Sequence, residues 1–362
     1  MSNGGDVAAK LRELVRARVE LESRLQGEPG EPGERAIADY ERSYGRLQKA
    51  LSSLFGESED AGLRTTIMLE LIRILENRLV YLQNFVVDPT SDNRMLASLV
   101  DRFIEELAAA KSNVLSPLES TYYRAIAALY AGDRAGARAG FLAACESEES
   151  DEANDIKYKS YVILGNLSHE EHDYERARDL HDASLRYSSN DNVTAQALAF
   201  KALNSYALGD YDEALGLFER ALGLFDAAAP FFNPYFHRNA LLFCGSIHYE
   251  RKAWDRAAEY YGRVVEEVEQ SSYDYFDALA QLGRIFYLTE RFDEAADRFG
   301  LAIESHRFSE NEYLVDTWYW LAKTRLRQNR VSEAKECLRR VTSSPVRYEN
   351  KSKAVELLAR VS

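Results

Sequence analysis

The chain lacks the features that membrane insertion, secretion or nucleic-acid binding would require. No apolar run approaches the roughly 18 residues that a membrane-spanning helix needs. The opening stretch, Met1-Ser-Asn-Gly-Gly-Asp6, has no basic region followed by an apolar core, so we expect no secretory signal. The 45 Lys and Arg are outnumbered by 59 Asp and Glu, the net charge is −14, and no Lys/Arg-rich run occurs. This balance argues against nucleic acid and against an anionic membrane surface as partners.

Cysteine and catalytic motifs are scarce as well. The three cysteines, Cys145, Cys244 and Cys337, are far apart, and no Cys-x-x-Cys pair occurs. We therefore expect reduced thiols with a structural role in a cytoplasmic protein. There is no Gly-rich phosphate loop and no Gly-x-Ser-x-Gly elbow, and His169 and His172 do not have zinc-protease spacing. The sequence predicts a protein that is not an enzyme and uses no metal and no cofactor.

What the chain does have is a pattern of small and bulky residues that recurs six times. Each copy has an Ala, a bulky residue four positions later and a small or β-branched residue seven later, all on one helical face. Another small residue, twelve positions before the Ala, lets a partner helix approach closely. The alanines are 37 to 43 residues apart and are Ala137, Ala177, Ala214, Ala257, Ala295 and Ala334. The bulky residues are Phe141, His181, Phe218, Tyr261, Phe299 and Leu338. The earlier small residues are Ala125, Gly165, Ala202, Gly245, Gly283 and Ala322.

This pattern resembles the tetratricopeptide repeat (TPR). Gly209-Asp-Tyr-Asp-Glu-Ala-Leu-Gly-Leu-Phe-Glu-Arg-Ala-Leu222 is similar to the turn and second helix of that repeat, and Leu282-Gly283 to the Leu-Gly pair of its first helix. The spacing exceeds the family period of about 34 residues, and the first and sixth copies match least well. The resemblance implies an all-α fold, a right-handed TPR α-solenoid of about six helical hairpins over residues 116–347. A C-terminal capping helix within 348–362 would follow.

Residues 1–115 are predicted to form an N-terminal helical bundle. A Gly/Pro breaker at 27–33 separates two apolar stripes, the second with the 3-4 spacing of a coiled-coil seam, so we expect an antiparallel hairpin. The first stripe is Val7, Leu11, Leu14, Leu21 and Leu25, and the second is Ile37, Tyr40, Tyr44, Leu47, Leu51 and Leu54. Stripes at 72–86 and 96–107 add a third and a fourth helix. The bundle either caps the first repeat or provides a dimer interface or a second docking surface.

In TPR proteins the first helix of each repeat lines a concave groove, and the resemblance implies the same here. The candidate partner-binding residues at those positions are Lys159, Asn166, His169, Gln196, Tyr206, Asn239, Ser246, Tyr249, Arg284, Tyr287, Tyr319, Lys323 and Arg327. An aromatic segment precedes the fourth repeat and either forms an exposed patch or fills a gap between repeats. It contains Phe231, Phe232, Tyr235 and Phe236.

These features together favour a scaffold or adaptor that binds a peptide or a helix of a partner protein in the groove. One alternative is a signal-responsive regulator with the domain order of the bacterial Rap-type proteins, whose groove binds a peptide and whose N-terminal bundle acts on a partner. Another is a structural subunit that self-assembles. A homodimer through the N-terminal helices is also open.

Overall fold

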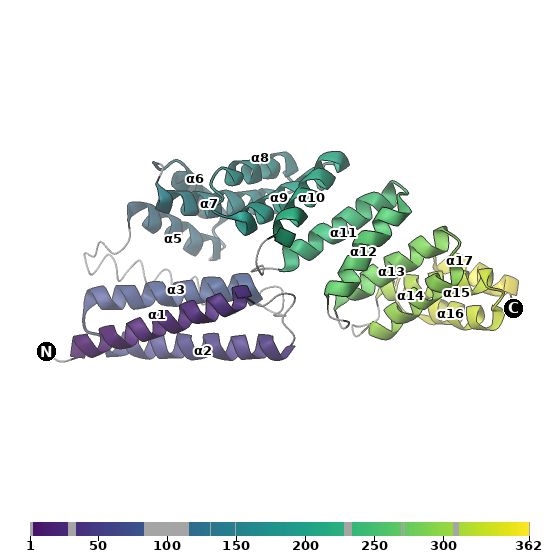
Figure 1. Cartoon of the computed structure of the whole chain (residues 1–362), viewed down its shortest axis with the longest axis horizontal. Helices are drawn as coiled ribbons and strands as arrows, with labels where there is room; N and C mark the ends of the chain where they lie inside the picture. Colours follow the sequence, from purple (N-terminus) through teal and green to yellow (C-terminus); the bar gives the residue numbers. More distant parts are fainter. Residues whose placement is uncertain are drawn as a thin grey trace. The chain divides into compact units, whose positions relative to one another are not determined.

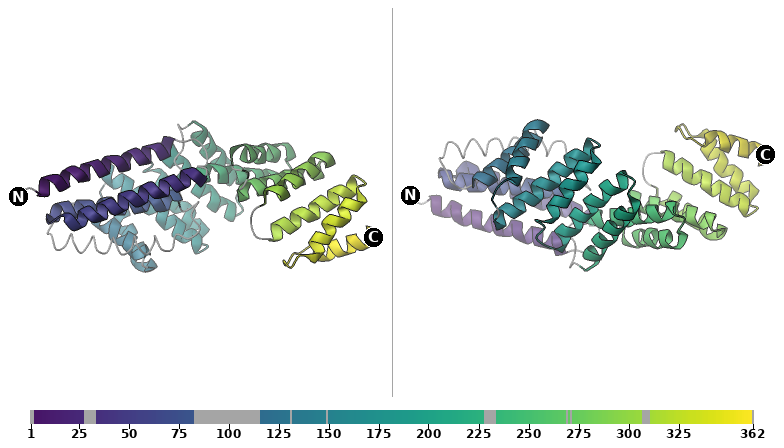
Figure 2. Two further views of the ribbon diagram at one scale, coloured as in Figure 1. Left: turned by 90° about the horizontal axis from the view of Figure 1, so that it is seen from below. Right: turned by 90° about the horizontal axis from the view of Figure 1, so that it is seen from above.

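The computed structural model describes residues 3–27, 34–82, 116–130, 132–148, 150–227, 234–268, 270, 272–306 and 311–361. Within these ranges every regular element is a helix, in agreement with the predicted all-α class. The N-terminal helices are α1 (Asn3–Gly27), α2 (Glu34–Glu57) and α3 (Ala61–Leu82). They lie side by side in Figures 1 and 2. The predicted fourth stripe, at 96–107, lies outside the described residues.

The rest of the described chain is a series of helical hairpins (Figure 1). The paired helices are α5 (Pro117–Tyr130) with α6 (Arg134–Cys145), α7 (Asp151–Glu170) with α8 (Tyr174–Leu185), α9 (Asp191–Ala207) with α10 (Tyr211–Ala227), α11 (Pro234–Glu250) with α12 (Trp254–Glu267), α13 (Tyr273–Leu288) with α14 (Phe292–Ser305), and α15 (Glu312–Arg327) with α16 (Val331–Ser343). A last helix, α17 (Lys351–Val361), packs against α16.

The chain divides into two compact units, Met1–His237 and Arg238–Ser362. The first contains α1 to α10, and the second contains α12 to α17 with most of α11. The sequence-based boundaries at residues 115 and 347 stay predictions. Each unit is described on its own below.

The predicted repeat pattern forms the core of every hairpin. All six alanines are fully buried, and the bulky residues four positions later are no more than 4% exposed. In three hairpins the earlier small residue is a glycine against which a ring packs: Gly165 under His181, Gly245 under Tyr261 and Gly283 under Phe299. The spacing of the sequence pattern therefore identifies which residues close each hairpin.

The contact between Gly283 and Phe299 gives a test with a built-in control. A Cβ atom at position 283 would lie 2.6 Å from Phe299 Cε1. We expect Gly283→Ala to lower the free energy of unfolding by about 1–3 kcal/mol, because the ring must shift in a packed core. A Cβ at Gly300, on the facing helix α14, meets nothing within 4 Å. Gly300→Ala should therefore stabilise by up to about 1 kcal/mol through helix propensity. Urea denaturation of both variants checks the two signs, and equal effects would contradict the packing argument.

The turn inside each hairpin is also the same throughout. Its central residue has positive φ in all six: Gly132, His172, Gly209, Lys252, Glu290 and Asn329. The amide of that residue bonds three positions back and the next amide bonds five positions back, as in His172 N to His169 O and Asp173 N to Ser168 O, both 2.9 Å. These paired bonds define a Schellman C-cap, which usually takes glycine because an L side chain disfavours positive φ. Four of the six hairpins use another residue.

The N-terminal helices share one hydrophobic core with the first hairpins of the same unit. A single cluster of buried side chains runs from Val7 and Leu51 through Ile67 to Tyr122 and Phe141. Helix α3 is central to it, since Ile67 to Ile72 are all buried, including the charged Glu70. Figure 1 shows α3 on the side of the bundle that faces α5 and α7. The bundle and the first repeats therefore share one buried core.

Two further features concern single residues. Ser116 and Glu119 form a capping box at the start of α5: Glu119 N donates to Ser116 Oγ (3.1 Å) and Ser116 N donates to Glu119 Oε2 (2.9 Å). Cys145, Cys244 and Cys337 are buried thiols that form no disulfide, as predicted. Burial raises the pKa of Cys145 and of Cys337 to about 11, which keeps both thiols protonated near neutral pH. None of the described helices combines the length and the apolar character that a membrane crossing requires.

Candidate functional site

Neighbouring first helices of the hairpins meet within each unit. In the first unit α5 contacts α7, and Tyr158 OH on α7 donates to Val193 O on α9 (3.1 Å). In the second unit α13 contacts α15, and the rings of Tyr287 and Trp320 meet edge to face at 5.3 Å. Because the candidate groove residues lie on these helices, side chains from consecutive repeats can act on one ligand.

In the first unit, two of the candidates are held in a buried polar network. Asn204 Nδ2 donates to His181 Nδ1 (2.9 Å) and to Phe200 O (2.8 Å). His181 Nδ1 is therefore an acceptor, and its Nε2–H donates to Asn166 Oδ1 (3.2 Å). His169 Nδ1 donates to Asn204 Oδ1 (2.8 Å). The network joins α7, α8 and α9, so Asn166 and His169 help to hold two repeats together.

The network requires a neutral His181. The ring is 1% exposed, and it stacks on Phe200 with the ring centroids 5.0 Å apart. Burial is the main cause that lowers the pKa of His181 to about 4; a hydrogen bond with the Val162 backbone opposes the shift, and the neighbouring His169 adds to it. A proton on Nδ1 would also face the Asn204 amide donor. The imidazole is therefore a structural hydrogen-bonding group at neutral pH.

In the second unit, four candidates lie in one cluster on α13 and α15. The Lys323 ammonium lies over three rings, 3.8 Å from the centroid of Trp320, 4.9 Å from Tyr287 and 5.7 Å from Tyr319. Burial lowers the pKa of Lys323, while Asp316 opposes that shift. Arg284, the fourth candidate, lies 5.9 Å from the Trp320 centroid. We call Arg284, Tyr287, Tyr319, Trp320 and Lys323 the cation–aromatic cluster.

Arg284 is held by a carboxylate between two helices. Its Nη2 donates to Asp316 Oδ2 on α15, and its Nη1 makes a long contact of 3.4 Å with Gln281 Oε1. Tyr348, in the segment before α17, donates its OH to Asp316 Oδ1 at 2.5 Å. The Nε atom of Arg284 is buried without a hydrogen-bond partner. Burial, followed by the bond to Asp316, raises the pKa of Tyr348, so its hydroxyl stays protonated and donates.

Of the remaining candidates, Tyr249 lies close enough to Arg284 and Asp316 for both to act on its pKa, which burial raises. Lys159 is exposed and pairs with Asp155 on its own helix at 2.7 Å. Tyr206 and Tyr249 each pack edge-on against the first aromatic residue of the next helix, Tyr211 and Trp254. Arg327 is exposed, lies over the ring of Phe292 and pairs with Glu290 at 3.3 Å. Half-buried positions are occupied by Gln196, Asn239 and Ser246.

Only part of the predicted aromatic segment can be placed. Phe231, Phe232 and the side chain of Tyr235 lie outside the described residues. The ring of Phe236 is half-buried and meets Phe200 edge to face at 4.8 Å. This one ring fills space beside the His181 network, whereas the exposure of the rest of the segment stays a prediction.

Sequence reasoning missed three members of the second-unit site: Asp316, Trp320 and Tyr348. Helical spacing carried a signal for two of them, because Asp316, Trp320 and Lys323 stand four and three residues apart and share one face of α15. Tyr348 could not be found this way, since it lies beyond α16 and reaches back to Asp316.

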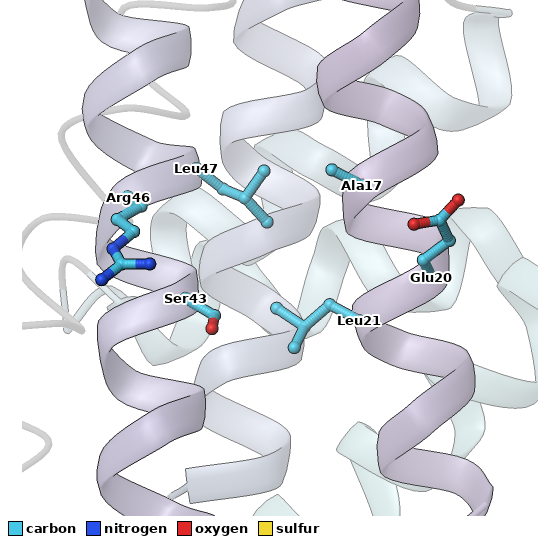
Figure 3. Close-up of a pocket in the computed structure, with 6 residues that line it drawn as sticks. All are labelled: Ala17, Glu20, Leu21, Ser43, Arg46 and Leu47. Atoms are coloured by element: carbon cyan, nitrogen blue, oxygen red, sulfur yellow. The ribbon is translucent and has the colours of Figure 1, made fainter.

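A separate hollow of about 280 Å³ lies between α1 and α2 (Figure 3). Leu21 and Leu47 are buried and form its apolar part, whereas Glu20 and Arg46 are exposed. Ala17 and Ser43 complete the lining. Its charged rim and apolar floor suit a single protruding side chain.

Comparison with known families identifies the repeats. A family model described as "Tetratricopeptide repeat" matches residues 315–344, which is the hairpin of α15 and α16. The chain is a tetratricopeptide-repeat protein. The matched copy is one of the two that fit the sequence pattern least well. Among curated proteins, no sequence match to the chain is found.

One solved structure supports the same fold, and two others are similar to part of the chain. A Signal Transduction ATPase with Numerous Domains from Pyrococcus horikoshii, described as having a tetratricopeptide repeat sensor, is 14% identical with a TM-score of 0.57. The match covers 88% of this chain and 49% of that one, so the TPR protein spans about half the length of this relative. BtubC (BKLC) from P. vanneervenii is 16% identical over 68% of this chain and 93% of its own, with a TM-score of 0.47. YrrB, described as a TPR protein with an unusual peptide-binding site, is 20% identical over 55% of this chain and 90% of its own, with a TM-score of 0.43.

Proposed function

We propose that this TPR protein is a non-enzymatic scaffold or adaptor of the cytoplasm that binds a peptide or a helix of a partner protein along its first helices. The cation–aromatic cluster carries the proposal. Its side chains stand on first helices but outside the Ala, bulky and small positions that close the hairpins. Rings and cations of this kind dominate the energetics of many protein interfaces, because they combine apolar area with directed polar groups.

A four-residue variant tests the assignment. We expect alanine at Tyr206, Tyr249, Arg284 and Tyr287 to weaken partner binding by about 100-fold or more, since several interface anchors are lost at once. The partner is first identified by co-purification with the full chain, and its affinity for each variant is then measured by calorimetry.

The matched control removes exposed side chains from second helices, through alanine at Leu142, Arg256 and Leu301. It should bind as the native chain does. Native affinity of the four-residue variant, with an unchanged circular dichroism spectrum, would refute the groove assignment.

The shared core of α1 to α3 with the first hairpins favours a second candidate, the signal-responsive regulator. Because Ile67 and Phe141 belong to one buried cluster, a conformational change caused by ligand binding at the repeats can be transmitted to the bundle through continuous packing. Hydrogen exchange of α1 to α3 separates the two candidates. Changed amide protection on partner binding indicates a regulator, whereas unchanged protection indicates a passive scaffold. We also propose that the N-terminal helices form a homodimer contact, in which the hollow between α1 and α2 receives a side chain of the second copy. The alternative is that the chain is a structural subunit that self-assembles.

A further inference from the structure

The inference concerns the chemistry of the ligand and rests on the proposed binding function. We propose that the cation–aromatic cluster binds the carboxylate of an acidic side chain, aspartate or glutamate, in a partner segment. Lys323 is the primary cation, Arg284 lies beside it, and the rings of Tyr287, Tyr319 and Trp320 form the apolar wall.

The first argument is that the Lys323 charge is not matched by an anion. It is half-buried over three rings, and among the described residues no carboxylate lies within ion-pairing distance of its ammonium group. Within the described chain, the one acid that acts on its pKa is Asp316, whose two oxygens already accept from Arg284 and from Tyr348. A lysine held in place by rings and partly removed from water pairs with an incoming carboxylate at little further cost in solvation or side-chain entropy.

The second argument is unused donor capacity around the same point. The buried Nε–H of Arg284 has no acceptor, and a buried donor without a partner is unfavourable. The hydroxyl groups of Tyr287 and Tyr319 make no hydrogen bond to any described residue. A carboxylate can accept from either hydroxyl group and is also attracted by the Arg284 and Lys323 cations, whereas a cationic ligand would be repelled by them.

The third argument is the local charge. Residues 323–362 contain 11 Lys and Arg but only four Asp and Glu, in a chain whose net charge is −14. The charge is therefore not evenly spread along the sequence, and Lys323 opens its most basic part. Lys353 acts on Lys323 from the start of α17. A positive field of this kind attracts acidic segments and repels basic ones.

The opposite assignment is that the three rings are a cage for a cation of the partner and that Lys323 occupies it as a placeholder. The two assignments differ in the sign of one effect. If Lys323 pairs with an anion, its removal weakens binding. If Lys323 is a placeholder, its removal frees the cage and strengthens the binding of a basic ligand.

The test is a selection of random peptides displayed on phage against the full chain, followed by a double-mutant cycle. We expect the selected peptides to be enriched in Asp and Glu. For one such peptide, Lys323→Gln should lower the affinity about tenfold, as should replacing the critical peptide carboxylate by its amide. The two changes together should cost no more than either alone, because they remove the same contact.

Two further variants keep the result interpretable. Lys323→Arg retains the charge and the attraction to the rings, and should bind within about threefold of the native chain. An unchanged circular dichroism spectrum of Lys323→Gln excludes a folding defect in that variant. Lys252→Gln removes an equal charge from the turn after α11 and should leave the affinity unchanged. Selection of basic peptides, or additive losses in the cycle, would overturn the acidic-ligand proposal while leaving peptide binding intact. Failure to select any peptide would refute the proposed function as well.

Discussion

Replacing Glu70 by alanine is expected to destabilise the first unit by about 3–5 kcal/mol. Glu70 and Arg18 form an ion pair between α3 and α1, with Arg18 Nε 2.7 Å from Glu70 Oε2 and side chains 5% and 12% exposed. The substitution removes the buried carboxylate that offsets the cost of desolvating the Arg18 guanidinium. Urea denaturation followed by circular dichroism measures the loss.

The control is a second ion pair in the same bundle. Lys10 and Glu57 are 3.5 Å apart and about half exposed, so Glu57→Ala should cost at most about 1 kcal/mol. Replacing Arg18 and Glu70 together by leucine should recover most of the stability, because no buried charge remains. If Glu70→Ala costs no more than Glu57→Ala, the ion pair does not hold α1 to α3.

The first unit should also lose stability in mild acid through His181. In the unfolded chain histidine has a pKa near 6.5, whereas burial lowers the pKa of His181 to about 4. Between these values the unfolded state binds more protons, so the free energy of unfolding is highest above pH 6.5 and falls as the pH drops towards 4. The full loss is roughly 3 kcal/mol, from about 1.4 kcal/mol per unit of pKa difference.

Denaturation curves at pH 7.5 and pH 4.5 measure this loss of stability. Two variants test whether His181 causes it. His181→Phe introduces the residue that three other repeats have at this position, as in Phe218, and should remove this part of the pH dependence. It should also lower stability at neutral pH, because Asn166 and Asn204 lose a partner. His172→Gln replaces an exposed histidine in the turn before α8 and should leave the pH dependence as it was. An unchanged pH dependence in His181→Phe would contradict the assignment.

The sequence predicted the hairpins well because their packing is local. Ala137 and Phe141 contact a helix that ends only a few residues earlier, so a fixed spacing repeats whenever the hairpin does. The capping box at Ser116 and the helix from Lys351 to Val361 were predictable for the same reason. The sixth copy matched the pattern poorly and is nevertheless the one that the family model recognises, which shows that the pattern and the family weigh different positions.

Contacts between hairpins were less predictable. The spacing identified His181 as a core position, but its partner Asn204 is 23 residues away in the next repeat. Glu70 was not recognised as a buried charge, because residues 67–72 of α3 are buried on every face and show no helical period of apolar and polar residues. The candidate list contained Lys323 and Arg284 but not the residues that orient them, Trp320 and Asp316. A fixed sequence spacing cannot predict such pairs, because their contact depends on how two repeats stack.

The four turns that lack glycine have a consequence for how this protein can change. His172, Lys252, Glu290 and Asn329 each adopt a backbone conformation that costs an L residue on the order of 1 kcal/mol. Glycine already occupies the same position at Gly132 and Gly209, so the substitution is compatible with the hairpin. The turns lie in separate repeats, and gains at distant sites usually add. Glycine substitutions in these turns are therefore available to stabilise the protein. During evolution they could offset destabilising substitutions on the binding face that allow a new partner to bind.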